Sequence, residues 1–319
     1  MRAIRVHVDG NARRLVMEEV PAPVPRPGQL LVKVAAFSVN HSDLMTGARG
    51  GSSEPFVPGL DVGGMIEAVG EGVSDWEPGD RIIALVRGSY AEFALARPVT
   101  SYRLPEGMGL QEGASIPGVF LTAWYGLTRW GRVKAGETVL VHAAGSGVGA
   151  AAIQIAHALG ARVVTSAGSD SKVARGIELG AEAGINYSTQ DVTAELQRLT
   201  QGKGVDMVLD SVGGQVFDAT LPALAHGGRV VMIGSPAGAR GEATQETLQS
   251  KGQSIQSMGV ANDAQEDSDQ QGWVQLKAWF ENGVLRPVVD RTLPWTEAEA
   301  AHQLLRERAV FGKIVLTVE

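Results

Sequence analysis

Short apolar runs alternate with helical patterns in the second half of the chain. Residues 138–142 form an apolar, β-branched run, which is typical of a strand buried on both faces. Small residues follow, and residues 150–159 then carry apolar side chains at helical spacing. Further apolar runs occur at 162–166, 205–210 and 228–234. Four strands alternating with helical segments predict an α/β fold with a doubly wound parallel sheet.

The first 120 residues show a different pattern, in which short runs are separated by Gly and Pro. We expect strands at 3–8, 15–20, 30–35, 58–64, 65–69, 78–86 and 90–94. Asn40 is of the N-cap type, so a short helix is expected at 40–45, with further helices at 110–114 and 119–130. This part therefore predicts a separate, mostly β domain.

The C-terminal part resumes a mixed pattern. Residues 261–271 are acidic without apolar spacing, which favours a solvated loop or helix start with no ligand role. An amphipathic helix, a strand, a second helix and a final strand are expected at 273–282, 287–293, 296–307 and 312–318. Thr296 and Glu299 form a capping-box pattern for the second helix. We expect the closing elements to return to the first domain, which gives domains of 1–121 with 285–319, and of 122–284.

A glycine-rich turn, A-A-G-S-G-V-G, joins the first strand of the parallel sheet to its helix. Strand, small-residue turn and helix together direct backbone N–H groups and a helix dipole at a pyrophosphate. Gly145, Gly147 and Gly149 allow close approach of the phosphates and tight packing of the helix. A tight turn without a ligand is the alternative, but the βαβ unit has the expected length of about 30 residues, which favours a dinucleotide site.

The end of the second strand bears on which dinucleotide binds. NAD sites usually place an acid there to bond the ribose 2′-OH. Here residues 165–167 read T-S-A, and the first acid is Asp170, followed by Lys172 and Arg175. A hydroxyl with cations suits the 2′-phosphate of NADPH. The alternative is that Lys172 and Arg175 are ordinary solvated helix residues, and for Arg175 this alternative is favoured.

Composition excludes several classes of function. The chain has 319 residues and a formal net charge of −7, which gives no footing for nucleic acid or an anionic membrane. It has no cysteine, so thiolate metal sites and disulfides are excluded. No run reaches the roughly 18 apolar residues of a membrane span, and the N-terminus lacks a signal-peptide pattern. A cytoplasmic location is expected.

Several motifs, in this order and spacing, resemble one family over essentially the whole chain. They are V-N-H-S-D-L, P-F-V-P-G-L-D-V-G-G-M-I-E-A-V-G-E-G-V, P-G-D-R-I, G-S-Y-A-E-F, L-T-A-W, V-H-A-A-G-S-G-V-G, L-G-A and F-G-K-I-V-L. The family is the zinc-independent, zeta-crystallin-like quinone oxidoreductases of the medium-chain dehydrogenase/reductase superfamily. The resemblance implies a GroES-like catalytic domain, a Rossmann domain, a cofactor cleft between them, NADPH-dependent reduction of quinones or related conjugated carbonyls, and often a homodimer.

Zinc independence also rests on particular positions. The zinc alcohol dehydrogenases of this superfamily have a Cys near residues 40–43 and a Gly-His-Glu near Gly59. Here the first segment has no Cys, and Leu60 and Asp61 follow Gly59. A lone histidine, His41, is more typical of a surface or hydrogen-bonding residue, so we expect no metal.

The resemblance implies cofactor contacts at matching positions. The residues near the nicotinamide would be Asn40 and Thr122. The pyrophosphate turn would comprise Ala144, Gly145, Ser146, Gly147 and Val148. The 2′-phosphate would meet Ser166, Lys172 and Tyr187. The nicotinamide ribose would be lined by Val212, Gly213, Ile233, Gly234 and Ser235. Arg308 matches a further basic contact of some members, and Lys313 is a weaker candidate for it.

The expected active site leaves alternatives open. Asn40 either donates to a developing oxyanion or holds the nicotinamide amide, and Asp43 either caps a helix or acts in catalysis. Met45 and Phe56 are expected at the substrate pocket, where Met45 replaces a tyrosine found in some members. Ser146 likewise replaces a usual glycine. The alternative functions are reduction of a 2-enoyl or alkenal double bond, and non-catalytic NADPH binding in a crystallin-like or sensory protein.

Overall fold

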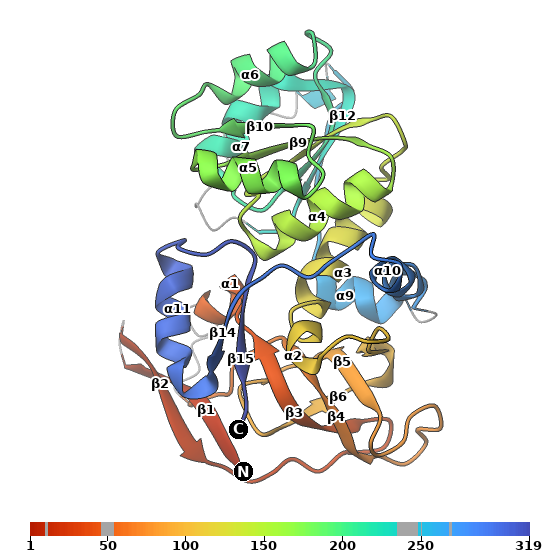
Figure 1. The fold of residues 1–319 in the computed structure, drawn as a ribbon, viewed down its shortest axis with the longest axis vertical. Helices are drawn as coiled ribbons and strands as arrows, with labels where there is room; N and C mark the ends of the chain where they lie inside the picture. The colour runs from red at the N-terminus through yellow and green to blue at the C-terminus, as the bar shows by residue number, and fades with distance from the viewer. Residues whose placement is uncertain (10–11, 46–53, 235–247, 250, 268–269) are drawn as a thin grey trace. The chain divides into compact units, whose positions relative to one another are not determined.

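The computed structural model describes residues 1–9, 12–45, 54–234, 248–249, 251–267 and 270–319. The chain folds into two compact units, shown in Figure 1. Unit 1 contains residues 1–118 and 264–319, and unit 2 contains residues 119–263. Among the described residues, no helix is both long enough and apolar enough to cross a membrane.

Unit 2 is built on a six-stranded parallel sheet with the strand order β10-β9-β8-β11-β12-β13. The strands are β8 (Thr138–Val141), β9 (Arg162–Ala167), β10 (Ala183–Asn186), β11 (Val205–Asp210), β12 (Leu224–Met232) and β13 (Ser254–Ser257). The strand order reverses between β8 and β11, which confirms the doubly wound sheet. The sequence pattern missed β10 and β13, because these short strands, A-G-I-N and S-I-Q-S, contain few large apolar residues.

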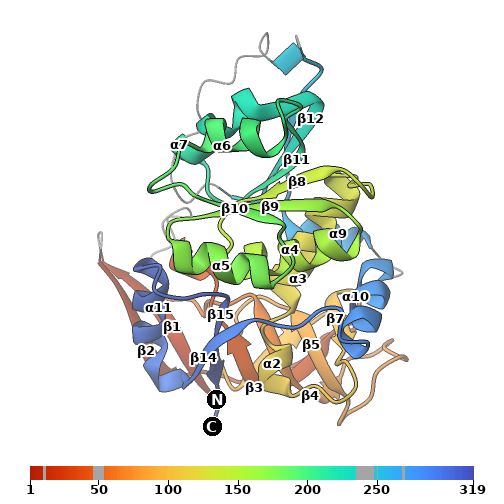
Figure 2. The same cartoon turned by 45° about the horizontal axis from the view of Figure 1, so that its top comes forward.

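Helices cover both faces of this sheet. They are α3 (Pro117–Tyr125), which begins in unit 1 and runs into a π-helical segment (Gly126–Trp130), α4 (Gly147–Ala158), α5 (Asp170–Glu178), α6 (Val192–Leu199), α7 (Gly214–Thr220), a 3-10 turn (Leu221–Ala223) and α9 (Val260–Glu266), which ends in unit 1. Helices α4 and α5 lie on one face and α6 and α7 on the other (Figures 1 and 2). This arrangement buries both faces of the strands, in agreement with their continuous apolar runs.

The acidic segment 261–271 contains the helix that was one of its two expected structures. Most of its first half is helix α9, and Asp263 is only 3% exposed. The carboxylate of Asp263 accepts a hydrogen bond from Trp130 Nε1 at 3.0 Å and lies 3.3 Å from the guanidinium of Arg129. The expectation of a solvated segment was therefore wrong at Asp263, because specific partners compensate for burying the charge.

Unit 1 contains a two-stranded sheet and a seven-stranded sheet. The first pairs β1 (Arg2–Asp9) with β2 (Ala12–Glu19) antiparallel, as expected. The second has the order β14-β15-β3-β4-β5-β7, with β6 paired to β3. Its strands are β3 (Leu30–Ser38), β4 (Asp61–Val69), β5 (Arg81–Leu85), β6 (Phe93–Ala96), β7 (Ser101–Arg103), β14 (Val289–Pro294) and β15 (Lys313–Thr317). The predicted mostly β domain is confirmed.

Short helices surround these sheets. They are α1 (His41–Met45), α2 (Leu110–Gly113), α10 (Gln271–Glu281) and α11 (Ala298–Arg306), with 3-10 turns at Pro98–Thr100 and Trp295–Glu297. The core between β3, β4 and α11 includes Phe37 and Tyr90, whose ring centroids are 4.3 Å apart, and the fully buried Trp295. Burial of a large apolar side chain stabilises a fold by about 1.5–3 kcal/mol, so these rings hold the two ends of unit 1's chain together.

The segments 58–64 and 65–69, expected as two strands, are not separated by a turn. Strand β4 runs without a break through Gly63 and Gly64. A methyl group on Gly63 would overlap the carbonyl oxygen of Leu110, and one on Gly64 would overlap that of Lys33. These glycines therefore permit close approach of helix α2 and of strand β3 to β4, and the prediction that they separate two strands was wrong.

Two C-terminal expectations also differ from the structure. Thr296 does not cap a helix, because the chain enters α11 through a 3-10 turn that places Trp295 in the core. The expected domain boundary at 284 lies after α10, whereas unit 2 ends at residue 263. Helix α10 belongs to unit 1, where the Trp273 ring lies 5.2 Å from that of Tyr102 and Gln270 donates to the Ser101 carbonyl at 2.9 Å.

We expect Gly149→Ala to destabilise the protein although alanine favours helices. A methyl group on Gly149 would overlap the carbonyl oxygen of Ala143, so α4 must move away from β8 at a cost of about 1–3 kcal/mol. The measurement is the midpoint of urea unfolding. Gly259→Ala is the matched control in unit 2, because nothing lies within 4 Å of the added methyl group. Equal midpoints for the two variants would contradict this role of Gly149.

Candidate functional site

The carboxyl edge of the unit 2 sheet gathers most of the expected cofactor residues. All six strands are parallel, so the loops that follow them emerge at one edge. One of the residues in question, Ser166, lies near the end of β9, and the others follow β8 (144–148), β9 (172), β10 (187), β11 (212–213) and β12 (233–234). The order reverses between β8 and β11, and this is where ligands of open α/β sheets bind.

The turn after β8 leaves backbone donors at the start of α4. Ser146 caps this helix, since its hydroxyl accepts the Gly149 N–H at 2.8 Å. Within the described residues, the N–H groups of Gly147 and Val148 donate to no protein acceptor. Two such groups at the N-terminus of a 12-residue helix form an anion-binding arrangement. Ser146, which replaces a usual glycine, therefore stabilises the helix start.

A cation lies beside this turn. A methyl group on Gly145 would lie 2.8 Å from Cδ of Lys172, so the Lys172 side chain extends across the turn from α5. Tyr187 lies near the same edge, where its hydroxyl would be 3.1 Å from a methyl group on Gly168. The structure thus places Lys172 in the first turn of α5 and Tyr187 just after β10, both near the end of β9, as an anion site beside the turn requires.

Ser166 does not fit its expected role. It is fully buried, and its hydroxyl lies 2.7 Å from Nδ1 of His142. Thr220 donates its hydroxyl to the Val216 carbonyl at 2.8 Å, so it accepts the Nε2–H of His142 at 2.9 Å. Burial lowers the pKa of His142, so the ring is neutral and Nδ1 accepts the Ser166 proton. The Ser166 hydroxyl is therefore engaged inside unit 2 and does not reach a phosphate at its surface.

The loop after β11 is held by a buried carboxylate. Asp210 is fully buried and accepts the N–H groups of Val212 at 2.8 Å and of Gly213 at 3.1 Å. These two amides are therefore used within the protein, and the loop offers a ligand its carbonyl groups. After β12, the Ile233 N–H donates to the Asp210 carbonyl at 2.9 Å, which ties the two neighbouring loops together.

Other expected site residues lie elsewhere or are not described. Thr122 is a largely buried residue of α3 in unit 2, and Arg308 is an exposed residue of unit 1 with a φ of 53°. Phe56 is half-buried and its backbone bridges to Val6 of β1. Ser235 and the side chain of Met45 lie outside the described residues.

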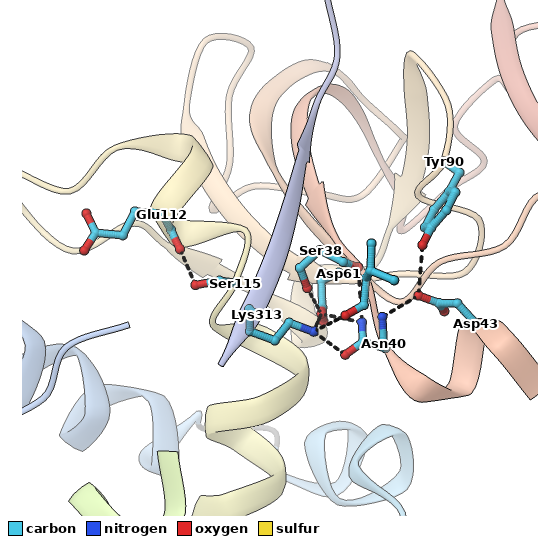
Figure 3. Close-up of polar contacts among 9 residues, drawn as sticks. Ser38, Asn40, Asp43, Asp61, Tyr90, Glu112, Ser115 and Lys313 are labelled. Carbon is cyan, nitrogen blue, oxygen red and sulfur yellow. Dashed lines mark hydrogen bonds and ion pairs between the residues drawn. The ribbon is translucent and has the colours of Figure 1, made fainter. Parts of the chain in front are cut away.

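Unit 1 brings polar side chains together where β3 meets α1, as Figure 3 shows. The Nδ2 of Asn40 donates to Asp61 Oδ2 at 2.8 Å and to the Ser38 carbonyl at 3.3 Å. Lys313 Nζ donates to Asn40 Oδ1 at 2.6 Å and lies 3.9 Å from Asp61 Oδ2. Every polar atom of the Asn40 amide therefore has a partner within unit 1.

Asp43 has a structural contact that supports its helix-capping interpretation. Its Oδ2 accepts the backbone N–H of Asn40 at 2.9 Å, which is the reciprocal half of a capping box. The Tyr90 hydroxyl lies 3.3 Å from the same oxygen and 3.0 Å from Nε2 of His302. Burial raises the pKa of Asp43 to about 7, against the opposing effects of the Asn40 N–H and the Lys313 charge.

Lys313, the weaker candidate for a basic cofactor contact, is buried and hydrogen-bonded within unit 1. It is 5% exposed and also donates to the Val39 carbonyl at 2.7 Å, and burial lowers its pKa. Sequence reasoning missed Lys313 and Asp61 as a pair. A signal was present, because each charge interrupts an apolar strand pattern, and buried charges require partners.

We expect the pH dependence of stability to report on Asp43. An unfolded aspartate has a pKa of about 3.9, so folding takes up a proton between that pH and about 7. The wild type should therefore lose stability relative to Asp43→Asn as the pH rises through this window, and the difference should level off above it. Thermal unfolding midpoints across this range test this.

The opposite shift of His302 does not obscure this comparison. Burial, followed by the charge of Arg13, lowers the pKa of His302 to about 4, which makes stability rise with pH over part of the window. This contribution is present in both proteins and cancels in their difference. Parallel curves for the two proteins would rule out the raised pKa of Asp43.

Two family models match the chain. The alcohol dehydrogenase GroES-like domain matches residues 26–120, and the zinc-binding dehydrogenase model matches residues 179–316. In the part of the chain that the structure describes, no group of three or more His, Cys, Asp or Glu residues is arranged to hold a metal ion.

Complete proteins match over nearly their whole length. A quinone oxidoreductase of Sus scrofa is 36% identical over 327 residues, which cover 99% of this chain and 97% of the relative. The solved quinone oxidoreductase of Escherichia coli, in complex with NADPH, has a TM-score of 0.92 and 27% identity, over 99% of this chain and 100% of that chain. The solved JamJ enoyl reductase has a TM-score of 0.88 and 28% identity over 100% of both chains.

These matches confirm the GroES-like and Rossmann architecture that the sequence predicted. The chain belongs to the quinone oxidoreductases of the medium-chain dehydrogenase/reductase superfamily, a family of nicotinamide-dependent oxidoreductases.

Proposed function

We propose that this protein uses NADPH to reduce quinones or related conjugated carbonyls without zinc. The observation that carries the proposal is the position of Lys172, whose side chain extends across Gly145 beside the free N–H groups of α4. A cation at this place, with no carboxylate among residues 165–167, favours a phosphate on the adenosine ribose over a bare 2′-OH.

The residues of unit 2 divide the binding of the cofactor among them. The N–H groups of Gly147 and Val148 and the α4 dipole bind the pyrophosphate. Lys172 and Tyr187 bind the 2′-phosphate, with Ser166 removed from this set because of its bond to His142. The carbonyls after β11 and the Ile233–Gly234 backbone contact the nicotinamide ribose. The bound cofactor supplies a hydride from its nicotinamide ring.

Residues of unit 1 orient the reacting end of the cofactor. Asn40 is half-buried and its amide is immobilised, which suits a group that fixes the reacting end of the cofactor. Positioning of this kind supplies several kcal/mol of barrier reduction in other systems, on the order of 7–11 kcal/mol at best. Zinc independence is supported by the sequence, which has no cysteine and has Leu60 and Asp61 after Gly59. The resemblance also favours a cytoplasmic homodimer.

A second function has a specific observation in its favour. The JamJ enoyl reductase covers 100% of this chain at a TM-score of 0.88, so the fold suits reduction of an enoyl double bond as well. That reaction requires a proton for the α-carbon, and residues 45–56 contain no tyrosine to donate it. Quinone reduction is therefore the preferred proposal, and enoyl or alkenal reduction the alternative.

Lys172→Ala tests which cofactor the site selects. Loss of a charge-assisted contact to the 2′-phosphate should weaken NADPH binding about tenfold or more, while NADH binding changes little. Affinities follow from the change in fluorescence of the reduced nicotinamide. Lys203→Ala is the matched control, because Lys203 is an exposed lysine that precedes β11, at the opposite edge of the sheet. Equal losses for NADPH and NADH would remove Lys172 from the phosphate site.

Turnover tests the function itself. We expect oxidation of NADPH, in preference to NADH, by a panel of quinones, with rates that a metal chelator does not change. Steady-state absorbance of the reduced nicotinamide gives the rates, and the panel includes enones and enoyl thioesters. Activity with enones or thioesters alone would transfer the function to double-bond reduction. Tight NADPH binding without turnover would favour the non-catalytic, crystallin-like or sensory alternative.

A further inference from the structure

The amide of Asn40 is locked by two charges of opposite sign. One N–H of Nδ2 donates to Asp61 Oδ2 at 2.8 Å and the other points to the Ser38 carbonyl at 3.3 Å. Its Oδ1 accepts from Lys313 Nζ at 2.6 Å. An amide has two N–H donors and an oxygen with two lone pairs. Both donors are therefore in use, and one lone pair of Oδ1 is left.

Electrostatic repulsion excludes the orientation of the Asn40 amide in which its oxygen and its NH₂ group exchange places. A half-turn of the Asn40 side chain would place its oxygen against Asp61 and the Ser38 carbonyl, and its NH₂ against the ammonium of Lys313. Asp61 is fully buried and Lys313 is 5% exposed, and such contacts are stronger in a low dielectric than in water. The identity of the two amide atoms follows from these charges.

The two charged residues are themselves held in place (Figure 3). The Ser38 hydroxyl donates to Asp61 Oδ2 at 2.6 Å, and Lys313 Nζ donates to the Val39 carbonyl at 2.7 Å. These contacts come from β3, β4 and β15, which pair side by side in one sheet. The sheet thus fixes the charges, and the charges fix the amide.

We propose that Asp61 and Lys313 are positioning residues that restrict Asn40 to accepting a hydrogen bond from the carboxamide NH₂ of the nicotinamide. This inference rests on the proposed function, because it takes the cofactor to bind with its reacting end at Asn40. The carboxamide NH₂ is a donor and so matches the remaining lone pair of Oδ1. Asn40 has no N–H left for a developing oxyanion, which decides between the two roles expected from the sequence.

Exchanging the side chains at positions 40 and 61 tests whether residue 40 acts as a hydrogen-bond acceptor or as a donor, because the exchange keeps the total charge of the cluster. Asn40→Asp alone sets two carboxylates about 2.8 Å apart, so only a shared proton restores the lock. Asn40→Asp combined with Asp61→Asn returns one carboxylate, one amide and the ammonium to the cluster. The NH₂ at position 61 then donates where Asp61 Oδ2 accepted, so the Ser38 hydroxyl must rotate to accept from it. The double variant keeps an accepting oxygen at position 40 but has no N–H there.

The readout is the dissociation constant of NADPH, from its fluorescence, between about pH 6 and about pH 9. We expect Asn40→Asp to bind about tenfold more weakly than the wild type at the upper pH, and the double variant to follow the wild type throughout. A folded double variant that binds as weakly as Asn40→Asp would overturn the inference, and so would unchanged binding by Asn40→Asp. Thermal midpoints confirm that each variant is folded.

A second measurement needs no change in the charged cluster. The NADPH analogue with an acetyl group in place of the carboxamide lacks the NH₂ donor. The wild type should bind it about tenfold more weakly than NADPH, and Asn40→Ala should bind the two alike. Equal affinities in the wild type would overturn the inference while leaving the proposed function intact. Failure of the wild type to bind NADPH at all would overturn the proposed function and this inference together.

Discussion

The close approach of helix α4 to strand β8 sets the geometry of unit 2. It depends on Gly149, because a side chain there would meet the carbonyl of Ala143. The turn between them holds Ala143 at a φ of 57°, and Ser146 then caps the helix. As a result, the first N–H groups of α4 point outward at the carboxyl edge of the sheet. The anion-binding character of the edge is therefore a consequence of backbone packing.

Unit 1 buries two charged side chains, Asp61 and Lys313, in the core beside its larger β-sheet. Asp61 and Lys313 lie on neighbouring parts of one sheet, and each has hydrogen-bond partners besides the other. A buried ion pair adds little net stability, since desolvation offsets the attraction. The role we propose for this ion pair is to orient Asn40, because only one of the two orientations of its amide group matches both charges. The neighbouring Asp43, Tyr90 and His302 form a second buried polar group that ties α1 to α11.

The two units offer different physical resources. Unit 2 offers backbone donors, a helix dipole and the Lys172 cation, which suit a charged and phosphorylated ligand. Unit 1 offers a neutral amide, that of Asn40, which Asp61 and Lys313 immobilise. Because the hydride chemistry belongs to the cofactor, the protein's part is binding and orientation.

The sequence by itself determined the two architectures and predicted the glycine-rich turn at the carboxyl edge of the parallel sheet, because period, turn chemistry and the glycine pattern are local properties. It placed the strand–turn–helix of 138–159 and the N-cap at Asn40 close to where they lie. Only the tertiary structure decided the state of Ser166, whose partner His142 lies 24 residues away, and of Lys313, which meets Asn40 across 273 residues. Such long-range pairs decide whether a polar side chain faces a ligand or the interior, and no local pattern records them.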